Sequence, residues 1–151
     1  MVKRTLAVVA IGGSLALLLS SPASAADLIK YQINNDAIAT SLTRKAGDPV
    51  KGKKLATNRK KGNCLACHSM PIPEQAFHGN IGPDLKGISS RYSEGELRLR
   101  IVNPKVLNSE TIMPAFYKAD GFNRVMKKFA GKTIITAQEV EDIVAYLMTL
   151  K

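Results

Sequence analysis

The sequence predicts an all-α protein built from short helices and loops. Two capping boxes, Ser93-Glu94-Gly95-Glu96 and Thr136-Ala137-Gln138-Glu139, each precede apolar residues at helical spacing. A further helix start is marked by Asp48 followed by Pro49, a pair that suits the N-cap and the first helical position. No segment gives a convincing pattern for a sheet.

The first elements surround the Asp-Pro pair. Residues 27–46 have mixed polarity and no strong period, which predicts an extended or weakly helical extension that wraps the domain or contacts a partner. The helix opened by the Asp-Pro pair should run to about Asn58. Gly52 within it would let another helix cross closely, and Tyr146 is the expected crossing residue.

Three later elements are predicted. The first capping box opens a helix that the Asn103-Pro104 pair ends, because a residue before proline disfavours the helical conformation. Residues 121–131 are predicted to form a short extra helix, since their apolar side chains share one helical face. These apolar residues are Phe122, Val125, Met126 and Phe129. The second capping box opens the clearest helix, about 137 to 150, with Glu141 and Asp142 on faces away from its apolar stripe.

The N-terminus has the pattern of an export signal. Lys3 and Arg4 precede an apolar run from Leu6 to Leu19, and Ala23-Ser24-Ala25 forms a cleavage site. The run is short for a membrane anchor and is interrupted by glycines. We therefore expect residues 1–25 to be removed, leaving a mature chain in the periplasm with no membrane span.

Charge limits the classes of partner. The chain carries 22 basic and 12 acidic side chains, a formal net charge of +10, and only 5% aromatic residues. Since no nucleic-acid motif appears and the expected compartment holds none, we expect no nucleic-acid partner. An acidic redox protein fits better. A solvated basic face is the alternative for clustered lysines such as Lys51, Lys53 and Lys54.

Both cysteines of the chain lie in one pentapeptide, Cys64-Leu65-Ala66-Cys67-His68. This C-x-x-C-H motif is typical of covalent c-type haem attachment, in which the two sulfurs form thioethers and the histidine binds the iron. A zinc site would need further ligands, a thioredoxin-like pair would need a βαβ pattern, and a disulfide would give the histidine no role. We expect one haem c, bound through Cys64 and Cys67, with His68 as an axial ligand.

The second axial ligand has several candidates. Met70 is too near His68 to reach the other face of the haem, while Met126 and Met148 lie on predicted apolar helix faces. Met113 precedes Pro114 in a loop 45 residues beyond His68, far enough to cross the haem edge. His/Met ligation is common in cytochromes c, which favours Met113 over the remaining alternative, His78.

These residues resemble the class I cytochromes c. The resemblance covers residues 47–150 and rests on the haem motif, Gly82-Pro83-Asp84-Leu85, Met113-Pro114 and the closing segment from Glu139 to Leu147. It implies a class I cytochrome c fold, with short helices and loops around one covalent haem, over a domain 47–151 preceded by an extension 26–46. It also implies that the Pro83 carbonyl accepts the Nδ1 proton of His68 and orients the ring.

Within that family, the chain is most similar to the monohaem X subunits of the SoxAX cytochromes of thiosulfate-oxidising bacteria. The similar segments are Gly82 to Ile88, Ile112 to Tyr117 and Thr136 to Asp142. This resemblance implies an electron-transfer subunit that accepts electrons when thiosulfate is coupled to a cysteine of a carrier protein. The expected partners are a dihaem or monohaem SoxA-like cytochrome and a downstream redox acceptor protein.

Within such an L-cysteine S-thiosulfotransferase complex, this subunit would be non-catalytic, because both of its cysteines would be consumed as thioethers. Two alternatives stay open from the sequence. One is a freely diffusing periplasmic cytochrome that serves a terminal oxidase or reductase. The other is an enzyme, such as a peroxidase, that acts at a five-coordinate haem.

Overall fold

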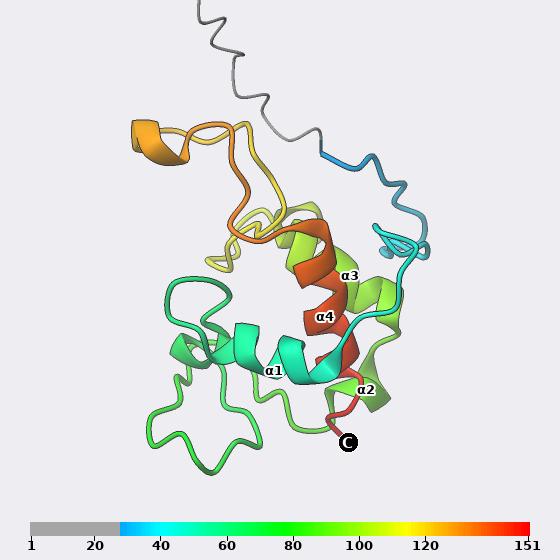
Figure 1. The fold of residues 1–151 in the computed structure, drawn as a ribbon, viewed down its shortest axis with the longest axis vertical. Coiled ribbons are helices and arrows are strands. Elements are labelled where there is room, and N and C mark those ends of the chain that lie inside the picture. The colour runs from blue at the N-terminus through cyan, green and yellow to red at the C-terminus, as the bar shows by residue number, and fades with distance from the viewer. Residues whose placement is uncertain (1–27) are drawn as a thin grey trace, which may run out of the picture.

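The computed structural model describes residues 28–151, so the predicted signal peptide lies outside the described residues. The described residues form four α-helices joined by long loops, with no strand beyond an isolated bridge between Asn34 and Ala37 (Figure 1). The helices are α1 (Pro49–Thr57), α2 (Ile88–Arg91), α3 (Glu94–Val102) and α4 (Ala137–Leu147). Short 3₁₀ turns lie at Cys64–Ala66, Pro104–Val106 and Lys127–Phe129. The all-α prediction is thus confirmed for this part of the chain.

The predicted helix starts are confirmed at three helices. The Asp48 carboxylate accepts hydrogen bonds from the backbone N–H groups of Val50 and Lys51, at the start of α1. Both capping boxes form, at Ser93 before α3 and at Thr136 before α4. Each cap satisfies backbone N–H groups that have no partner within the first helical turn. Helix α2 was not predicted, since its four residues are too few to establish a period.

The crossing of α1 over α4 forms the centre of the fold (Figure 1). A Cβ atom on Gly52 would overlap the backbone carbonyl of Asp142 and lie 2.7 Å from the Cβ of Tyr146. Only glycine allows the two helices to approach so closely. The predicted crossing of Gly52 and Tyr146 is therefore confirmed, and α1 in turn places the haem motif that follows it.

Residues 28–46 run along α3 and α4 as an irregular segment that turns at residues 34–37 and buries Ile38 and Leu42. A buried ion pair holds this segment: the Arg98 guanidinium donates to the Glu141 carboxylate, with Nε 2.9 Å from Oε1, and to the carbonyl of Ile38. Glu141 also accepts the Leu42 N–H at 2.8 Å. The sequence placed Glu141 away from the apolar stripe of its helix, yet it is buried because these donors surround it.

The predicted extra helix at residues 121–131 is wrong. These residues lie on an exposed loop that stands away from the helices, and only the 3₁₀ turn Lys127–Phe129 is helical (Figure 1). Positive φ angles at Gly121, Arg124 and Gly131 interrupt any longer helix. Among residues 28–151, no helix combines the length and the apolar character that a membrane span requires.

Candidate functional site

The Cys-x-x-Cys-His motif forms a tight turn directly after α1. The carbonyl of Cys64 accepts hydrogen bonds from the N–H groups of Cys67 and His68, at 3.1 and 2.9 Å. The following loop is fastened to the same turn, because Gly79 donates to Leu65 O and Gly82 donates to Cys67 O, both at 2.7 Å. The turn and the loop therefore form one rigid unit around the motif.

This unit fixes the orientation of the His68 ring. His68 Nδ1 lies 2.7 Å from the carbonyl oxygen of Pro83. A carbonyl can only accept, so Nδ1 carries the proton and Nε2 keeps its lone pair, as a metal ligand must. Gly82 packs against the ring so closely that a Cβ there would overlap it. The geometry thus agrees with the contact between His68 and Pro83 that the family resemblance implies.

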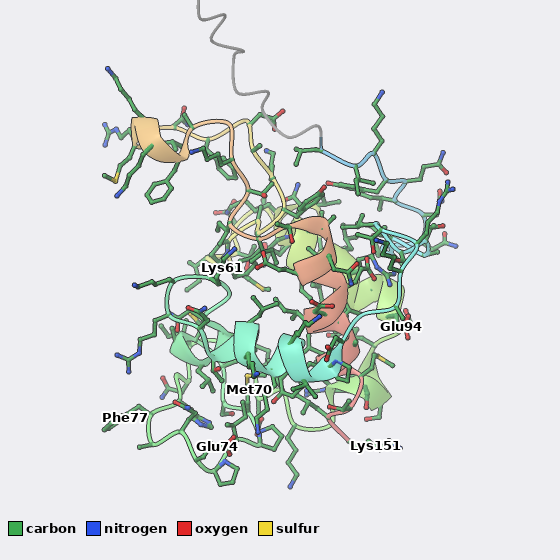
Figure 2. All side chains as sticks on the ribbon, viewed as in Figure 1. Lys61, Met70, Glu74, Phe77, Glu94 and Lys151 are labelled. Carbon is green, nitrogen blue, oxygen red and sulfur yellow. The ribbon has the colours of Figure 1, made fainter. Side chains whose placement is uncertain are left out.

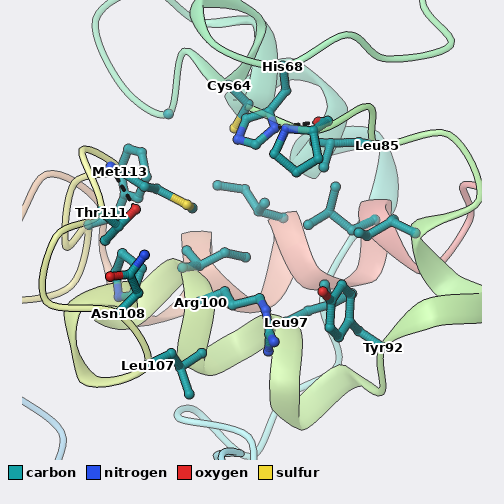
Figure 3. Close-up of a pocket in the computed structure, with 18 residues that line it drawn as sticks. Cys64, His68, Leu85, Tyr92, Leu97, Arg100, Leu107, Asn108, Thr111 and Met113 are labelled. Atoms are coloured by element: carbon teal, nitrogen blue, oxygen red, sulfur yellow. Dashed lines mark hydrogen bonds between the residues drawn. The ribbon is translucent and has the colours of Figure 1, made fainter. Parts of the chain in front are cut away.

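Met113 reaches the same cavity from the loop between α3 and α4. Its backbone N–H donates to the Thr111 hydroxyl at 3.2 Å, and Pro114 follows. Figure 3 shows the Met113 sulfur and the His68 imidazole directed into one space, with the Cys64 sulfur beside the histidine. Met113 therefore lines the same cavity as His68 and Cys64.

His78, the alternative ligand, lies elsewhere. It is absent from the residues that line the cavity, and its Nδ1 accepts the backbone N–H of Met70 at 3.2 Å. Its Nε2 is buried without a hydrogen-bond partner in the described structure. Met70, which is too near His68 in the sequence to reach the other face of the haem, is buried in the core.

The cavity has an inner and an outer part, of about 320 and 440 Å³. Both parts are bounded by Cys64, His68, Pro83 and Met113, so they are two halves of one slot. The inner half is lined by apolar side chains of α3 and α4, among them Leu97 and Ile143. The outer half opens to solvent between Ile81 and Ile112, whose side chains are 68% and 73% exposed.

Arg100 is a site residue that the sequence did not single out. It lines the inner half of the slot, and its guanidinium carbon lies 4.0 Å from the centroid of the Tyr92 ring. An arginine in an otherwise apolar slot can pair with a carboxylate of a bound group. The sequence feature that could have identified Arg100 is its position between Leu99 and Ile101, both of which are buried.

The rival interpretations of the motif receive no support from the described residues. Cys64 and Cys67 form no disulfide, no strand is available for a βαβ unit, and no cluster of three His, Cys, Asp or Glu side chains lies between residues 28 and 151. Burial raises the pKa of the Cys64 thiol to about 11. An unattached Cys64 would therefore be a poor nucleophile at neutral pH.

These features define the class of protein as a c-type cytochrome: an all-α fold, a C-x-x-C-H turn and an apolar slot with His and Met side chains directed into it. The comparison with known families agrees. The family model described as Cytochrome c matches residues 49–151, and the chain belongs to this family. Its cofactor is therefore covalently bound haem c.

The slot fits that group. It is apolar on the inner side and open at one edge, and its walls carry the two cysteines together with one nitrogen and one sulfur donor. The apolar wall would keep such a group away from water, and the open edge would leave part of it accessible to a redox partner. This chain is an electron-transfer domain of the cytochrome c family.

Two known proteins place the chain more closely. A chain in the crystal structure of SoxXA from P. pantotrophus is 40% identical, with a TM-score of 0.74, over 80% of this chain and 94% of that chain. An uncharacterized lipoprotein of Aquifex aeolicus (strain VF5) is 32% identical over 107 residues, which are 71% of this chain and 45% of the relative. This chain thus matches less than half the length of that relative. The fold is that of a class I cytochrome c similar to SoxX.

Proposed function

We propose that this chain is the monohaem, electron-accepting subunit of a SoxXA-like complex that oxidises thiosulfate. The observation that carries the proposal is the similarity to a chain of the SoxXA structure, at 40% identity over nearly all of that chain. The three sequence segments that resemble SoxAX X subunits support it, since they include the Gly82-Pro83 loop and the Met113-Pro114 loop that bound the slot.

Four side chains have proposed roles in holding the haem. Cys64 and Cys67 would hold the haem through thioethers, and His68 Nε2 and Met113 Sδ would bind its iron. Pro83 keeps the proton on His68 Nδ1 and so increases the electron density that the ring offers to the iron. The bound haem supplies reversible one-electron transfer between ferric and ferrous iron. The apolar wall and the methionine ligand raise the reduction potential.

The electrons come from a reaction outside this chain. When the outer sulfur of thiosulfate joins a cysteine sulfur of the carrier protein, one S–S bond forms and one proton and two electrons are released. This chain contributes no thiol to that bond, because both of its cysteines are thioethers in the proposal. The role left to it is to accept electrons one at a time through the open edge between Ile81 and Ile112 and pass them to a redox acceptor protein.

The proposal includes a location and a division of the chain. Residues 1–25 are an export signal removed on passage to the periplasm, residues 26–46 are an extension, and residues 47–151 are the haem domain. The partner in the complex is a dihaem or monohaem SoxA-like cytochrome. Support for the extension comes from the hydrogen bonds that fasten Ile38 and Leu42 to the domain.

One purification tests the proposal. The tagged chain is isolated gently from the periplasm of thiosulfate-grown cells of its host, and the gel is stained for covalent haem. We expect a second haem-bearing band at a near-equal amount, whose sequence identifies a SoxA-like cytochrome. A lone haem band would overturn the complex and indicate a freely diffusing carrier. An oxidised spectrum without a methionine-to-iron band would instead favour an enzyme with an open iron position.

A further inference from the structure

A long loop between Tyr117 and Ile135 lies outside the haem slot, apart from Ile134, which lines the outer half of the slot. Both of its ends are fixed, because Phe116 O accepts hydrogen bonds from the N–H groups of Ile134 and Ile135, at 3.0 and 3.2 Å. Phe116 is in turn bonded to Ile101 of α3. Residues 118–134, here called the 118–134 loop, therefore begin and end at the same fixed point of the domain. The loop projects beyond the helices in Figure 1.

The loop exposes apolar side chains that a soluble surface would normally avoid. Phe122, Met126 and Phe129 are 45%, 61% and 55% exposed. Contiguous exposed apolar groups of this kind mark sites of association. Phe122 and Phe129 do not simply project outward: with Val125 they line a groove of about 820 Å³ between the loop and the body of the domain.

The rim of this groove is basic. The loop carries five basic residues and one acidic residue, and Lys60, Lys105 and one acidic residue, Glu110, line the groove from the body of the domain. No basic residue of the loop forms an ion pair within the described residues. Lys118 and Lys128 lie instead over the rings of Phe122 and Phe129, at 5.3 and 4.8 Å from the ring centroids. The groove thus combines aromatic walls with basic residues that form no ion pair within residues 28–151.

The floor of the groove also forms part of the haem slot. Residues 111–114 line both the groove and the outer half of the slot. A protein seated in the groove would therefore contact the segment that carries Met113 and would lie beside the open edge of the slot. This position suits a partner that exchanges electrons with the chain, because the transfer path would be short.

We propose that the groove and the 118–134 loop are the docking surface for the SoxA-like subunit. This inference rests on the function proposed above. The docked face of that subunit carries acidic side chains around one or two apolar side chains that enter between Phe122 and Phe129. A second copy of this chain is excluded by charge, since two such basic loops would repel each other. An anionic membrane is disfavoured by shape, because the aromatic rings line a concave groove and a bilayer requires apolar groups that protrude.

The test uses the holo chain and the SoxA-like subunit purified from the complex of the same host. Two variants change the loop: Phe122→Ser with Phe129→Ser removes the aromatic walls, and Lys127→Glu with Lys128→Glu reverses the charge. Phe77→Ser and Lys151→Glu are matched controls, because both side chains are exposed and lie at the end of the molecule farthest from the loop in Figure 2. All four proteins should keep the wild-type haem spectrum, since the changed side chains are exposed.

The aromatic variant should bind the subunit at least about tenfold more weakly, since aromatic anchors dominate the affinity of such interfaces. The charge variant should associate more slowly and lose the salt dependence of the wild type. Unchanged binding by both variants, with the complex intact, would overturn this docking surface and leave the proposed function standing. If the wild-type chain formed no complex with a SoxA-like subunit, both the docking surface and the proposed function would be overturned. If the loop variants lost binding to phosphatidylglycerol vesicles but bound the subunit normally, the partner at this surface would be a membrane and not the subunit.

Discussion

Individual residues determine how the His68 ring is held. The hydrogen bond to Pro83 sets its tautomer, and Gly82 lets the Gly-Pro loop approach the ring. Neither contact could be derived from spacing alone. The motif predicts that a histidine binds iron, but only the folded loop places a carbonyl 2.7 Å from the other ring nitrogen.

Replacing Met113 tests the second axial ligand. Met113→Ala should lower the reduction potential by a substantial part of the roughly 0.8 V range that axial ligands span, because the thioether stabilises ferrous iron. The variant should also lose the methionine-to-iron absorption band and bind cyanide readily. Potentiometry and absorption spectroscopy measure both effects.

Met126→Ala is the matched control for this substitution, since Met126 is exposed on the 118–134 loop and does not line the slot. It should leave the potential and the spectrum unchanged. A Met113→Ala protein with the wild-type potential would show that another group binds the iron.

At the scale of elements, local signals predicted the helices that begin with a cap. The capping boxes at Ser93 and Thr136 satisfy backbone groups within a few residues, so a sequence window contains the whole cause. The prediction of a helix at residues 121–131 was wrong because its apolar side chains line an exposed groove and do not enter the core. The spacing of apolar residues alone does not distinguish these two cases. Burial of Glu141 depends on Arg98 and Leu42, which are distant in the sequence.

The α1–α4 crossing leads to a stability prediction. Gly52→Ala should destabilise the protein by about 1–3 kcal/mol, because the added methyl group overlaps the Asp142 carbonyl and forces the helices apart. Lys51→Ala, one residue earlier on the exposed face, should change stability by less than about 0.5 kcal/mol. Denaturant unfolding of the two holo proteins measures the difference, and equal midpoints would contradict the close packing.

The buried ion pair between α3 and α4 gives a second prediction at this scale. Arg98→Met leaves the Glu141 carboxylate buried without its cation, which should cost about 3–5 kcal/mol. Glu94→Gln should have little effect, since Glu94 is exposed and lies 3.8 Å from Arg98. Thermal unfolding compares the two variants. A larger loss in Glu94→Gln would assign the stabilising role to the exposed pair.

Across the whole molecule, the core is arranged around the slot, so the cofactor is part of the packing. Without a bound group, the apolar side chains that line the inner half would face water, at a cost of about 25 cal/mol for each Å² of apolar surface. The free energy of unfolding of a small domain is only about 5–15 kcal/mol, so such exposure matters. Loss of the haem should therefore affect folding as well as redox activity.

The double variant Cys64→Ser with Cys67→Ser tests this dependence. We expect it to retain little haem after denaturing electrophoresis and to lose helical signal in far-UV circular dichroism, since its thiols can form no thioether. A control with Ser69→Ala, next to the motif, should keep covalent haem. A double variant that remained fully helical without haem would contradict a core that depends on the cofactor.

The hydrogen bonds from Leu42 to Glu141 and from Asp48 to Asp142 join positions 99 and 94 residues apart. A chain delivered N-terminus first cannot close these contacts until α4 has emerged. The two thiols arrive some seventy residues earlier than α4. Until then the slot lacks the wall that Ile143 and Leu147 of α4 provide. The order of residues along the chain therefore places the motif well before the last wall of its own slot.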